Sequence, residues 1–318
     1  MPSAAECTVV VPVYRNEENV PALLQRLADL HARVPGGIRA LLVVDGSPDR
    51  SYERLREGLA AAPYAARLLL LSRNFGSFAA IRAGLIEVET PWMAVMAADL
   101  QEPAELFEAC FARLRSGEVD VVLASRSGRA DPWLDRLASG LFWGAYRRLV
   151  QPDLPPGGID VFACNTPFRD RLVAFSESNS SLVGQLLWLG FRREEVAYVR
   201  QAREIGSSAW TFRRKLKYLA DSVFSFSDLP IRLFLLLGGL GLLASALFAL
   251  TVLGARLSGL IEVPGYTATV LSVLFFSALN LFGLGVIGSY VWRAYENTKA
   301  RPLAVVMQRD EFTGGSAP

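Results

Sequence analysis

Short apolar runs alternate with helical patterns through the N-terminal part of the chain. The runs predict strands, at Cys7–Val13, Ala40–Asp45, Leu68–Ser72, Trp92–Ala98 and Val119–Ala124. Between them, apolar residues recur every three or four positions and predict helices, at Asn16–Leu30, Asp49–Ala60, Phe75–Val88 and Pro103–Ser116. Strands that are apolar along their whole length are typical of a sheet buried on both faces. The pattern therefore predicts an α/β domain with a mostly parallel sheet covered by helices.

A different pattern governs the C-terminal part of the chain. From Leu233 to Trp292 the only charged residues are Arg256 and Glu262. A helix rises about 1.5 Å per residue, so about 20 uncharged residues suffice to cross the hydrocarbon core of a membrane. The pattern predicts two transmembrane helices, at about 233–255 and 266–291. Two buried helices of a soluble domain are the less favoured alternative.

Basic residues decide how these spans are oriented. They crowd the start of 211–228, where apolar residues share one face, and this predicts an amphipathic helix in the headgroup region. A helix that packs on the soluble core is the alternative. Lys and Arg also flank both spans on the side of the two termini, so both termini are predicted to be cytoplasmic. The predicted organisation is a domain at 1–210, the amphipathic helix at 211–228, two spans within 229–292 and a cytoplasmic tail at 293–318.

Composition excludes several classes of protein. The net charge is +2, which does not favour a nucleic-acid partner. His31 is the only histidine, so neither a Ser-His-Asp hydrolase nor a poly-His metal centre is expected. The three cysteines lie far apart, without CxxC spacing, and favour a reduced compartment over a disulfide framework. The N-terminus lacks a basic region and is predicted to be a first strand, not a signal peptide.

Polar residues follow three of the predicted strands abruptly. They lie at 14–18, 45–49 and 99–102. Ligands of doubly wound sheets bind beyond the carboxyl ends of the strands, so these segments predict a binding site. Neither GxGxxG nor GxxxxGK[ST] is present, which argues against a dinucleotide fingerprint and a P-loop.

These segments form part of a longer series of motifs. In chain order they read VVVPVYRNEENV, VVDGSPD, LSRNFGSFAAIRAGL, AADLQEP, PPGGIDVF, WLGF, RQAREIGSSAWTF and SFSDLPIR. The series resembles the family 2 glycosyltransferases of the GT-A fold. Within them it is similar to the membrane-anchored polyprenyl-phosphate glycosyltransferases related to dolichol-phosphate mannose synthase. The resemblance implies a Rossmann-like GT-A catalytic domain, a nucleotide-sugar donor and a lipid phosphate acceptor.

The resemblance also implies a divalent metal, Mg²⁺ or Mn²⁺, at the motif AADLQEP. Such a metal takes oxygen ligands and neutralises the nucleotide diphosphate as it leaves. The family pattern is D-x-D followed by x-Q, so Asp99 and Gln101 are the expected metal ligands. Ala97 replaces the first Asp of that pattern, and Val44 replaces the first Asp of the family's VDDGS. For Glu102, a solvent-facing carboxylate at a helix start is the expected role, and a contribution to the metal shell is the alternative.

The other site residues expected from the resemblance fall into three groups. The donor is expected to contact Pro12, Tyr14, Glu18, Asp45, Arg73 and Asp99. The lipid phosphate is expected to meet Arg126, Arg129, Arg200, Arg203 and Ser208, since guanidinium groups match phosphate oxygens. The catalytic residues are expected to be Asp99, Asp160 and Arg126. A phosphate monoester is already largely dianionic and needs no base, so Asp160 is given an orienting or sugar-binding role, with stabilisation of a turn as the alternative. For each arginine, a solvated surface position is the alternative.

The expected function is an inverting transfer of a sugar from a nucleotide sugar to a polyprenyl phosphate of the undecaprenyl-phosphate type. The reaction is placed at the cytoplasmic membrane face, in a cell-envelope glycan or glycan-modification pathway. One alternative is a catalytically impaired membrane protein that binds nucleotide sugar or a partner, because Ala97 and Val44 remove two carboxylates. The other is a polymerising family 2 synthase, which the lack of QxxRW and the small number of spans disfavour. Small residues at four-residue spacing in the spans allow helices to pack closely within or between chains, so a homo-oligomer is an open alternative.

Overall fold

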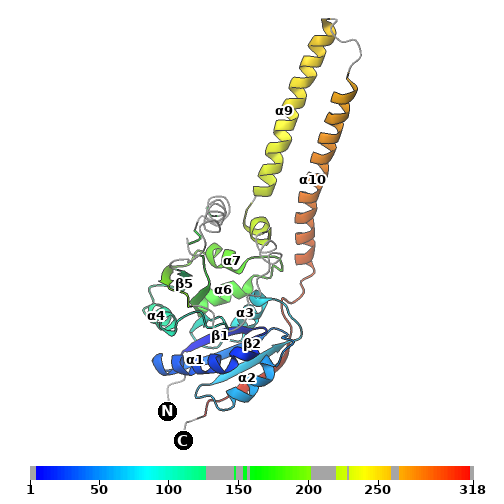
Figure 1. The fold of residues 1–318 in the computed structure, drawn as a ribbon. Helices are drawn as coiled ribbons and strands as arrows, with labels where there is room; N and C mark the ends of the chain where they lie inside the picture. The colour runs from blue at the N-terminus through cyan, green and yellow to red at the C-terminus, as the bar shows by residue number, and fades with distance from the viewer. Residues whose placement is uncertain are drawn as a thin grey trace.

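The computed structural model describes residues 5–126, 147, 153–155, 158–201, 220–227, 229–258 and 265–315. An α/β domain carries two long helices that project from it next to each other (Figure 1). The predicted α/β class is confirmed. The strands and helices predicted before residue 126 all form, the first strand with the predicted bounds and the others with shifted ends.

The domain is built on one eight-stranded sheet with the order β7-β5-β6-β4-β1-β2-β3-β8. The strands are β1 (Cys7–Val13), β2 (Ile38–Val44), β3 (Ala66–Leu71), β4 (Trp92–Val95), β5 (Val121–Arg126), β6 (Val161–Asn165), β7 (Arg193–Tyr198) and β8 (Val306–Phe312). Neighbouring strands are parallel except where β6 pairs with β4 and β5, and where β8 pairs with β3.

Helices cover both faces of the sheet. One face packs against α1 (Val20–Arg33), which follows the short 3₁₀ helix η1 (Glu17–Asn19), and against α2 (Ser51–Leu59) and α4 (Ala104–Arg115). The other face packs against α3 (Ser77–Ile86), α6 (Thr166–Ala174) and α7 (Leu182–Trp188). Successive residues of a strand point to opposite faces. Val9 and Val11 are accordingly buried in the first core, and Val10 in the second.

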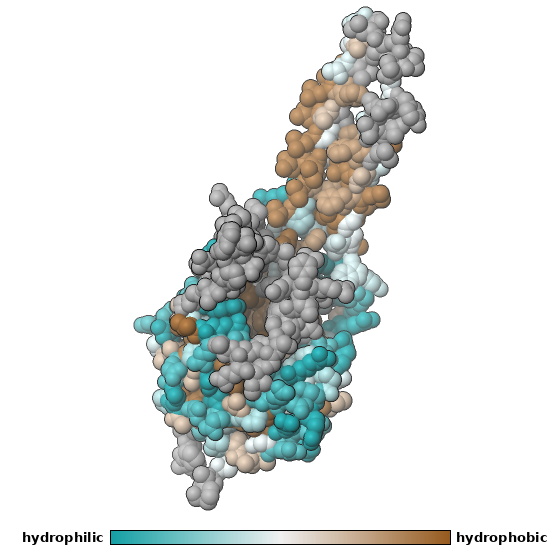
Figure 2. Space-filling model, in the orientation of Figure 1, coloured by the Kyte–Doolittle hydropathy of each residue, from teal (hydrophilic) through white to brown (hydrophobic). Residues whose placement is uncertain are grey.

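The two projecting helices are α9 (Leu229–Leu257) and α10 (Tyr266–Thr298), at the positions of the predicted spans. Figure 2 shows that their surface is hydrophobic, in contrast to the hydrophilic surface of the domain. Among the described residues, Phe275–Thr298 is long and apolar enough to cross a membrane. A second candidate is the bent pair Ala220–Phe226 and Leu229–Gly241, whose helices meet at 80°. One span is therefore supported directly, and the predicted second one only if this bent pair counts as a span.

The amphipathic helix predicted at 211–228 lies largely outside the described residues. Its described part includes the helix Ala220–Phe226, which packs on the α/β domain. The Phe226 ring lies so close to Gly184 in α7 that a Cβ on Gly184 would come within 2.4 Å of it. Ser225 Oγ donates a hydrogen bond to the Asn179 carbonyl oxygen at 2.8 Å. This segment therefore joins α7 to the base of the projecting helices.

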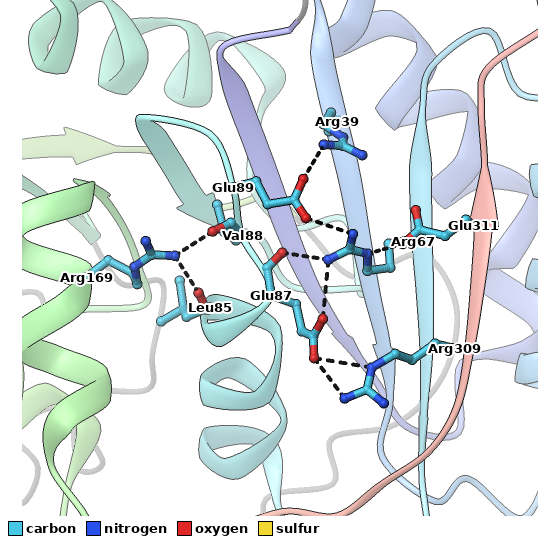
Figure 3. A network of polar contacts seen from close by, with 9 residues as sticks. All are labelled: Arg39, Arg67, Leu85, Glu87, Val88, Glu89, Arg169, Arg309 and Glu311. Atoms are coloured by element: carbon cyan, nitrogen blue, oxygen red, sulfur yellow. Dashed lines mark hydrogen bonds and ion pairs between the residues drawn. The ribbon is translucent and has the colours of Figure 1, made fainter.

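The C-terminal residues differ from the predicted tail. After α10 the chain returns to the domain, and β8 pairs antiparallel with β3 at the edge of the sheet. Arg309 Nη2 lies 3.0 Å from Glu87 Oε1, and Arg67 forms ion pairs with Glu87, Glu89 and Glu311 (Figure 3). An unpaired edge strand is a site for unwanted pairing with other chains, and β8 covers this one.

Candidate active site

The carboxyl ends of the parallel strands meet at one edge of the sheet. β5 ends there at Arg126 and β7 at Tyr198, while Asp160 immediately precedes β6, which runs in the opposite direction. The segments that follow β1, β2 and β4 reach the same edge because these strands are mutually parallel. The edge therefore brings together the polar segments that were predicted to form a site.

The acidic motif forms a tight turn after β4. Leu100 has a φ of 59°, in the left-handed region that residues other than glycine rarely adopt. On either side of it, Asp99 and Gln101 both lie beside Arg200. The Arg200 Nη2 donates to Gln101 Oε1 at 2.5 Å and lies 3.7 Å from Asp99 Oδ2. Strain of this kind is maintained by the surrounding structure and is common at functional sites.

The segment after β7 is held on this motif by its main chain as well. The Gln201 N–H donates to the Gln101 carbonyl oxygen at 2.9 Å, and Gln101 Nε2 donates to the Gln201 carbonyl oxygen at 3.0 Å. Arg200, expected at the acceptor phosphate, thus lies against both predicted metal ligands. A guanidinium held beside these two oxygens indicates that the acidic motif attracts a cation.

Asp160 and Arg126 form a two-pronged ion pair. Arg126 Nε donates to Asp160 Oδ2, and Arg126 Nη2 donates to Oδ1 at 2.6 Å. The Tyr198 hydroxyl donates to the same Oδ2 at 2.9 Å. Burial lowers the pKa of Arg126, but the ion pair outweighs it and leaves that pKa above its ordinary value. Burial and the charge of Asp160 raise the pKa of Tyr198. Both groups therefore keep their protons, and Asp160 orients Arg126.

Glu102 is not on the surface, although a glutamate before a proline at a helix start is normally exposed. The residue is 2% exposed, and its Oε2 makes no hydrogen bond in the described part of the chain. Burial is the largest cause that raises its pKa to about 7; Asp99 and Asp160 add to it, and Arg200 opposes it. The expectation of a solvent-facing carboxylate is wrong because the turn after β4 directs this side chain inward. No sequence signal distinguishes it from an ordinary helix-start glutamate.

Asp45 holds the loop after β3. Its Oδ1 accepts a hydrogen bond from the Phe75 N–H at 2.7 Å, and its Oδ2 accepts one from the Gly76 N–H at 2.8 Å. The neighbouring Gly46 has a φ of 54°, and a Cβ there would lie 2.2 Å from the carbonyl carbon of Arg73. Only glycine fits this close approach. Asp45, expected at the donor, gives both carboxylate oxygens to the loop that carries Arg73.

The loop after β1 is fixed by Asp49, which sequence motifs did not single out. Asp49 Oδ1 accepts a hydrogen bond from Ser47 Oγ at 2.6 Å, and Oδ2 accepts one from the Glu17 N–H at 3.2 Å. Arg15 has a φ of 53°, and its N–H donates to Ser47 Oγ at 2.8 Å. The Ser-Pro-Asp sequence was the available signal, because such side chains hydrogen-bond to nearby backbone in turns.

The remaining residues expected at the donor surround these loops. Pro12 and Tyr14 are half-buried, and Glu18 is exposed. Arg73 is also exposed, and its guanidinium lies over the Phe75 ring, 4.1 Å from the ring centroid. Arg129, Arg203 and Ser208, expected at the acceptor phosphate, lie outside the described residues.

The oxygen atoms at the acidic motif fit a divalent metal whose remaining ligands come from a substrate. In the described residues, no three His, Cys, Asp or Glu side chains form a cluster that could hold a metal by itself. The Asp99 carboxylate and the Gln101 amide oxygen are the hard ligands that Mg²⁺ and Mn²⁺ take, and Glu102 Oε2 is a buried oxygen in the same charged cluster. A diphosphate and water would complete the coordination shell.

The sequence comparisons identify the domain. The family model described as "Glycosyl transferase family 2" matches residues 8–174. The chain belongs to glycosyl transferase family 2. The range matched by the family 2 model contains most of the site, from the loop after β1 to Asp160, whereas Tyr198 and Arg200 lie beyond it.

Two curated relatives of this family 2 chain align over nearly the whole length. An undecaprenyl-phosphate 4-deoxy-4-formamido-L-arabinose transferase of Pseudomonas paraeruginosa is 33% identical over 98% of this chain and 96% of its own. A bactoprenol glucosyl transferase of Shigella phage SfX is 27% identical over 95% of this chain and 99% of its own. Family and enzyme class therefore agree with what the motifs indicated.

A solved structure supports the fold. The mannosyltransferase PcManGT from Pyrobaculum calidifontis, in complex with GDP-Man and Mn²⁺, matches with a TM-score of 0.50 and 16% identity. The match covers 88% of this chain and 87% of the other. At this identity the likeness shows the fold alone, and it confirms the predicted GT-A-like architecture.

Proposed function

We propose that this family 2 enzyme transfers a sugar, with inversion, from a nucleotide sugar to a polyprenyl phosphate of the undecaprenyl-phosphate type. The observation that carries the proposal is the pairing at one sheet edge of an oxygen-ligand motif, Asp99 and Gln101, with two arginines, Arg126 and Arg200. The first pair suits a nucleotide diphosphate and its cation, and the second suits a phosphate acceptor. The names of the two full-length relatives support the acceptor class.

The donor is held by the loops after β1, β3 and β4. Tyr14, half-buried beside the turn fixed by Asp49, is the residue proposed to stack on the nucleotide base. Asp45 fixes the loop that places Arg73 at the same edge. A divalent metal held by Asp99 and Gln101 would neutralise the negative charge that develops on the leaving diphosphate.

The acceptor needs cations and not a base. A lipid phosphate is largely dianionic at neutral pH, so one of its oxygens attacks the anomeric carbon directly. The bond from that carbon to the nucleotide diphosphate breaks as the new bond to the lipid phosphate forms on the opposite face. No proton has to move. Arg126, fixed in orientation by Asp160 and Tyr198, binds and orients the attacking phosphate.

The two long helices support a membrane location for the proposed reaction. α9 leads away from the domain and α10 leads back, and β8 then joins the sheet of the same domain (Figure 1). A chain that crosses the membrane by α9 and α10 would have the domain and both termini on one side. The basic residues flanking these helices favour the cytoplasmic face of the inner membrane. The proposed boundaries remain a domain at 1–210, an interfacial helix at 211–228 and spans within 229–292. The segment after the spans contains β8, which belongs to the sheet of the domain.

The test is nucleotide release by the purified full-length protein in detergent. UDP-, GDP- and dTDP-sugars are supplied with Mg²⁺ or Mn²⁺, with and without a short polyprenyl phosphate. We expect release from one donor class that requires both metal and lipid, together with a glycosylated lipid whose anomeric configuration is opposite to that of the donor. Release that is independent of the lipid contradicts the proposed acceptor.

A second candidate function is a membrane protein that binds nucleotide sugar without transferring it. It is favoured by Ala97 and Val44, which stand where the family pattern has carboxylates. The same experiment separates the two functions: detectable nucleotide binding without release from any donor supports the second.

A further inference from the structure

One oxygen of the buried Glu102 side chain has no hydrogen-bond partner. It is 2% exposed, and Oε2 has no hydrogen bond in the described residues. The backbone makes the local contact instead, because the Glu102 carbonyl oxygen accepts a hydrogen bond from Arg26 Nη1 at 2.8 Å. Burying a carboxylate oxygen without a hydrogen bond is costly, so it weakens the folded state unless something binds to it.

The groups around Glu102 are those of the active site. The charges that act on it belong to Asp99, Arg200 and Asp160, and its own charge acts on Arg126 and Tyr198. Among the described residues, Arg200 acts on both the Asp99 and the Glu102 carboxylate, and Asp160 is already paired with Arg126. The Arg200 Nε is also buried without a hydrogen-bond partner. Glu102 thus lies among the charged groups of the acidic motif, where a buried carboxylate oxygen can take a cation as its partner.

The acidic motif lacks one carboxylate on the same segment. Ala97 stands at the position of the first Asp of the family pattern, five residues before Glu102. We infer that Glu102 supplies the carboxylate that Ala97 lacks, and that Asp99, Gln101 and Glu102 together provide the protein oxygens for a divalent cation. The inference rests on the proposed metal-dependent transfer. It accounts for a glutamate that is buried, has one oxygen without a hydrogen bond and is surrounded by the charged groups of the site.

The test measures metal binding and not turnover. Mn²⁺ affinity of the full-length protein in detergent is determined by the electron paramagnetic resonance of free Mn²⁺, with and without UDP. Glu102→Gln keeps the size of the side chain and removes its charge, and we expect it to weaken Mn²⁺ binding about tenfold. The matched control is Glu105→Gln, one turn further along in α4, where the side chain is 65% exposed and ion-paired with Arg33. This control should bind Mn²⁺ as the unmodified protein does.

A rescue variant separates replacement of a ligand from general damage. Ala97→Asp combined with Glu102→Gln returns a carboxylate to the family position, and we expect it to recover most of the lost affinity. Unchanged Mn²⁺ affinity in Glu102→Gln overturns the inference, and so does a loss that Ala97→Asp does not restore. Circular dichroism melting confirms that each variant is folded, and Glu102→Asp, which keeps the charge, should retain more affinity than Glu102→Gln.

The inference and the proposed function can fail separately. Mn²⁺ binding that depends on Glu102, in a protein that releases no nucleotide, leaves the inference standing and refutes the transfer. Metal- and lipid-dependent release with unchanged Mn²⁺ affinity in Glu102→Gln supports the transfer and refutes the inference.

Discussion

Two clusters of arginines and carboxylates lie at opposite ends of the same sheet and are built differently. The amino-end cluster consists of Arg39, Arg67, Glu87, Glu89, Arg309 and Glu311 (Figure 3). The carboxyl-end cluster consists of Asp99, Gln101, Glu102, Arg126, Asp160, Tyr198 and Arg200. In the first, the Arg67 guanidinium lies against three carboxylates and a backbone carbonyl oxygen. In the second, Glu102 Oε2 and Arg200 Nε are buried without hydrogen bonds in the described residues.

The difference indicates that the amino-end cluster serves stability and the carboxyl-end cluster serves function. In the amino-end cluster, burial lowers the pKa of Arg67, but the hydrogen bonds that Arg67 donates to Glu89 and Glu311 outweigh it, so the charge is compensated within the protein. The cluster joins β8 to the rest of the sheet and needs no ligand. The carboxyl-end cluster keeps unsatisfied groups and a carboxyl group whose pKa is raised to about 7. Such groups in native proteins point to a binding or catalytic role.

The largest expected effect tests whether the carboxyl-end cluster is the catalytic one. Asp99→Asn removes a charged metal ligand and leaves the shape of the turn after β4. We expect lipid-dependent nucleotide release to fall about 10²–10³-fold, with a melting temperature close to that of the unmodified protein. Glu89→Gln in the exposed part of the amino-end cluster is the matched control and should leave turnover unchanged. Full activity in Asp99→Asn would remove the metal assignment.

The next effect concerns the orientation of Arg126. Asp160→Asn breaks the two-pronged ion pair and leaves Arg126 in place, so we expect kcat/KM for the lipid phosphate to fall about 10–100-fold. Donor affinity, measured by nucleotide binding, should change little. Tyr198→Phe removes one hydrogen bond to Asp160 and should act in the same direction more weakly. A selective loss of donor binding would instead assign Asp160 to the sugar.

A smaller effect, on stability alone, is expected in the amino-end cluster. Arg67→Met leaves three carboxylates around one position without their shared cation, and Arg67 is 17% exposed. We expect the free energy of unfolding to fall by about 2 kcal/mol, measured as a lower melting temperature, with unchanged kcat for the folded fraction. Arg33→Met breaks a more exposed pair, with Glu105, and should lower the melting temperature much less. Equal losses in the two variants would show that the network adds nothing beyond surface pairs.

The smallest expected effect is an increase in stability at alkaline pH. The pKa of Glu102 is raised from 4.5 to about 7 in the folded protein, so the folded state holds a proton that the unfolded state releases between these values. Its contribution to stability is present below about pH 4.5 and is lost as the pH rises through about 7. In metal-free protein, Glu102→Gln should therefore raise the melting temperature at pH 8 by the equivalent of about 1–2 kcal/mol and change it little at pH 5. A lower melting temperature at pH 8 would place Glu102 among the stabilising groups.

The pattern of apolar residues predicted the first half of the sheet because these strands are buried on both faces. β1 has the predicted bounds, and β2 to β5 and their helices differ from the predictions at their ends. The pattern did not indicate β6, β7 or β8. β7 and β8 lie at the two edges of the sheet, where residues alternate between exposed and half-buried positions and the apolar signal is weak. Their places depend on pairing with strands far away in sequence.

For the site, too, the sequence indicated the residues but not the contacts between them. Motifs indicated Asp99, Gln101, Arg126, Asp160 and Arg200, and the fold brings these residues to one edge of the sheet. Nothing in the sequence paired Arg126 with Asp160 or placed Arg200 against the acidic motif. These contacts join segments 34 and 99 residues apart.

The sequence by itself determined the family, the order of strands and helices in the N-terminal half, the strand ends that carry the site and the apolar character of the C-terminal helices. These properties are local, since they follow from periodicity, turn chemistry and short motifs. Only the tertiary structure decided that Glu102 is buried, that Asp45 and Asp160 position other groups, and that residues after α10 complete the sheet. Burial, hydrogen-bond partners and electrostatic neighbours depend on segments that meet only when the chain folds, so no local pattern encodes them.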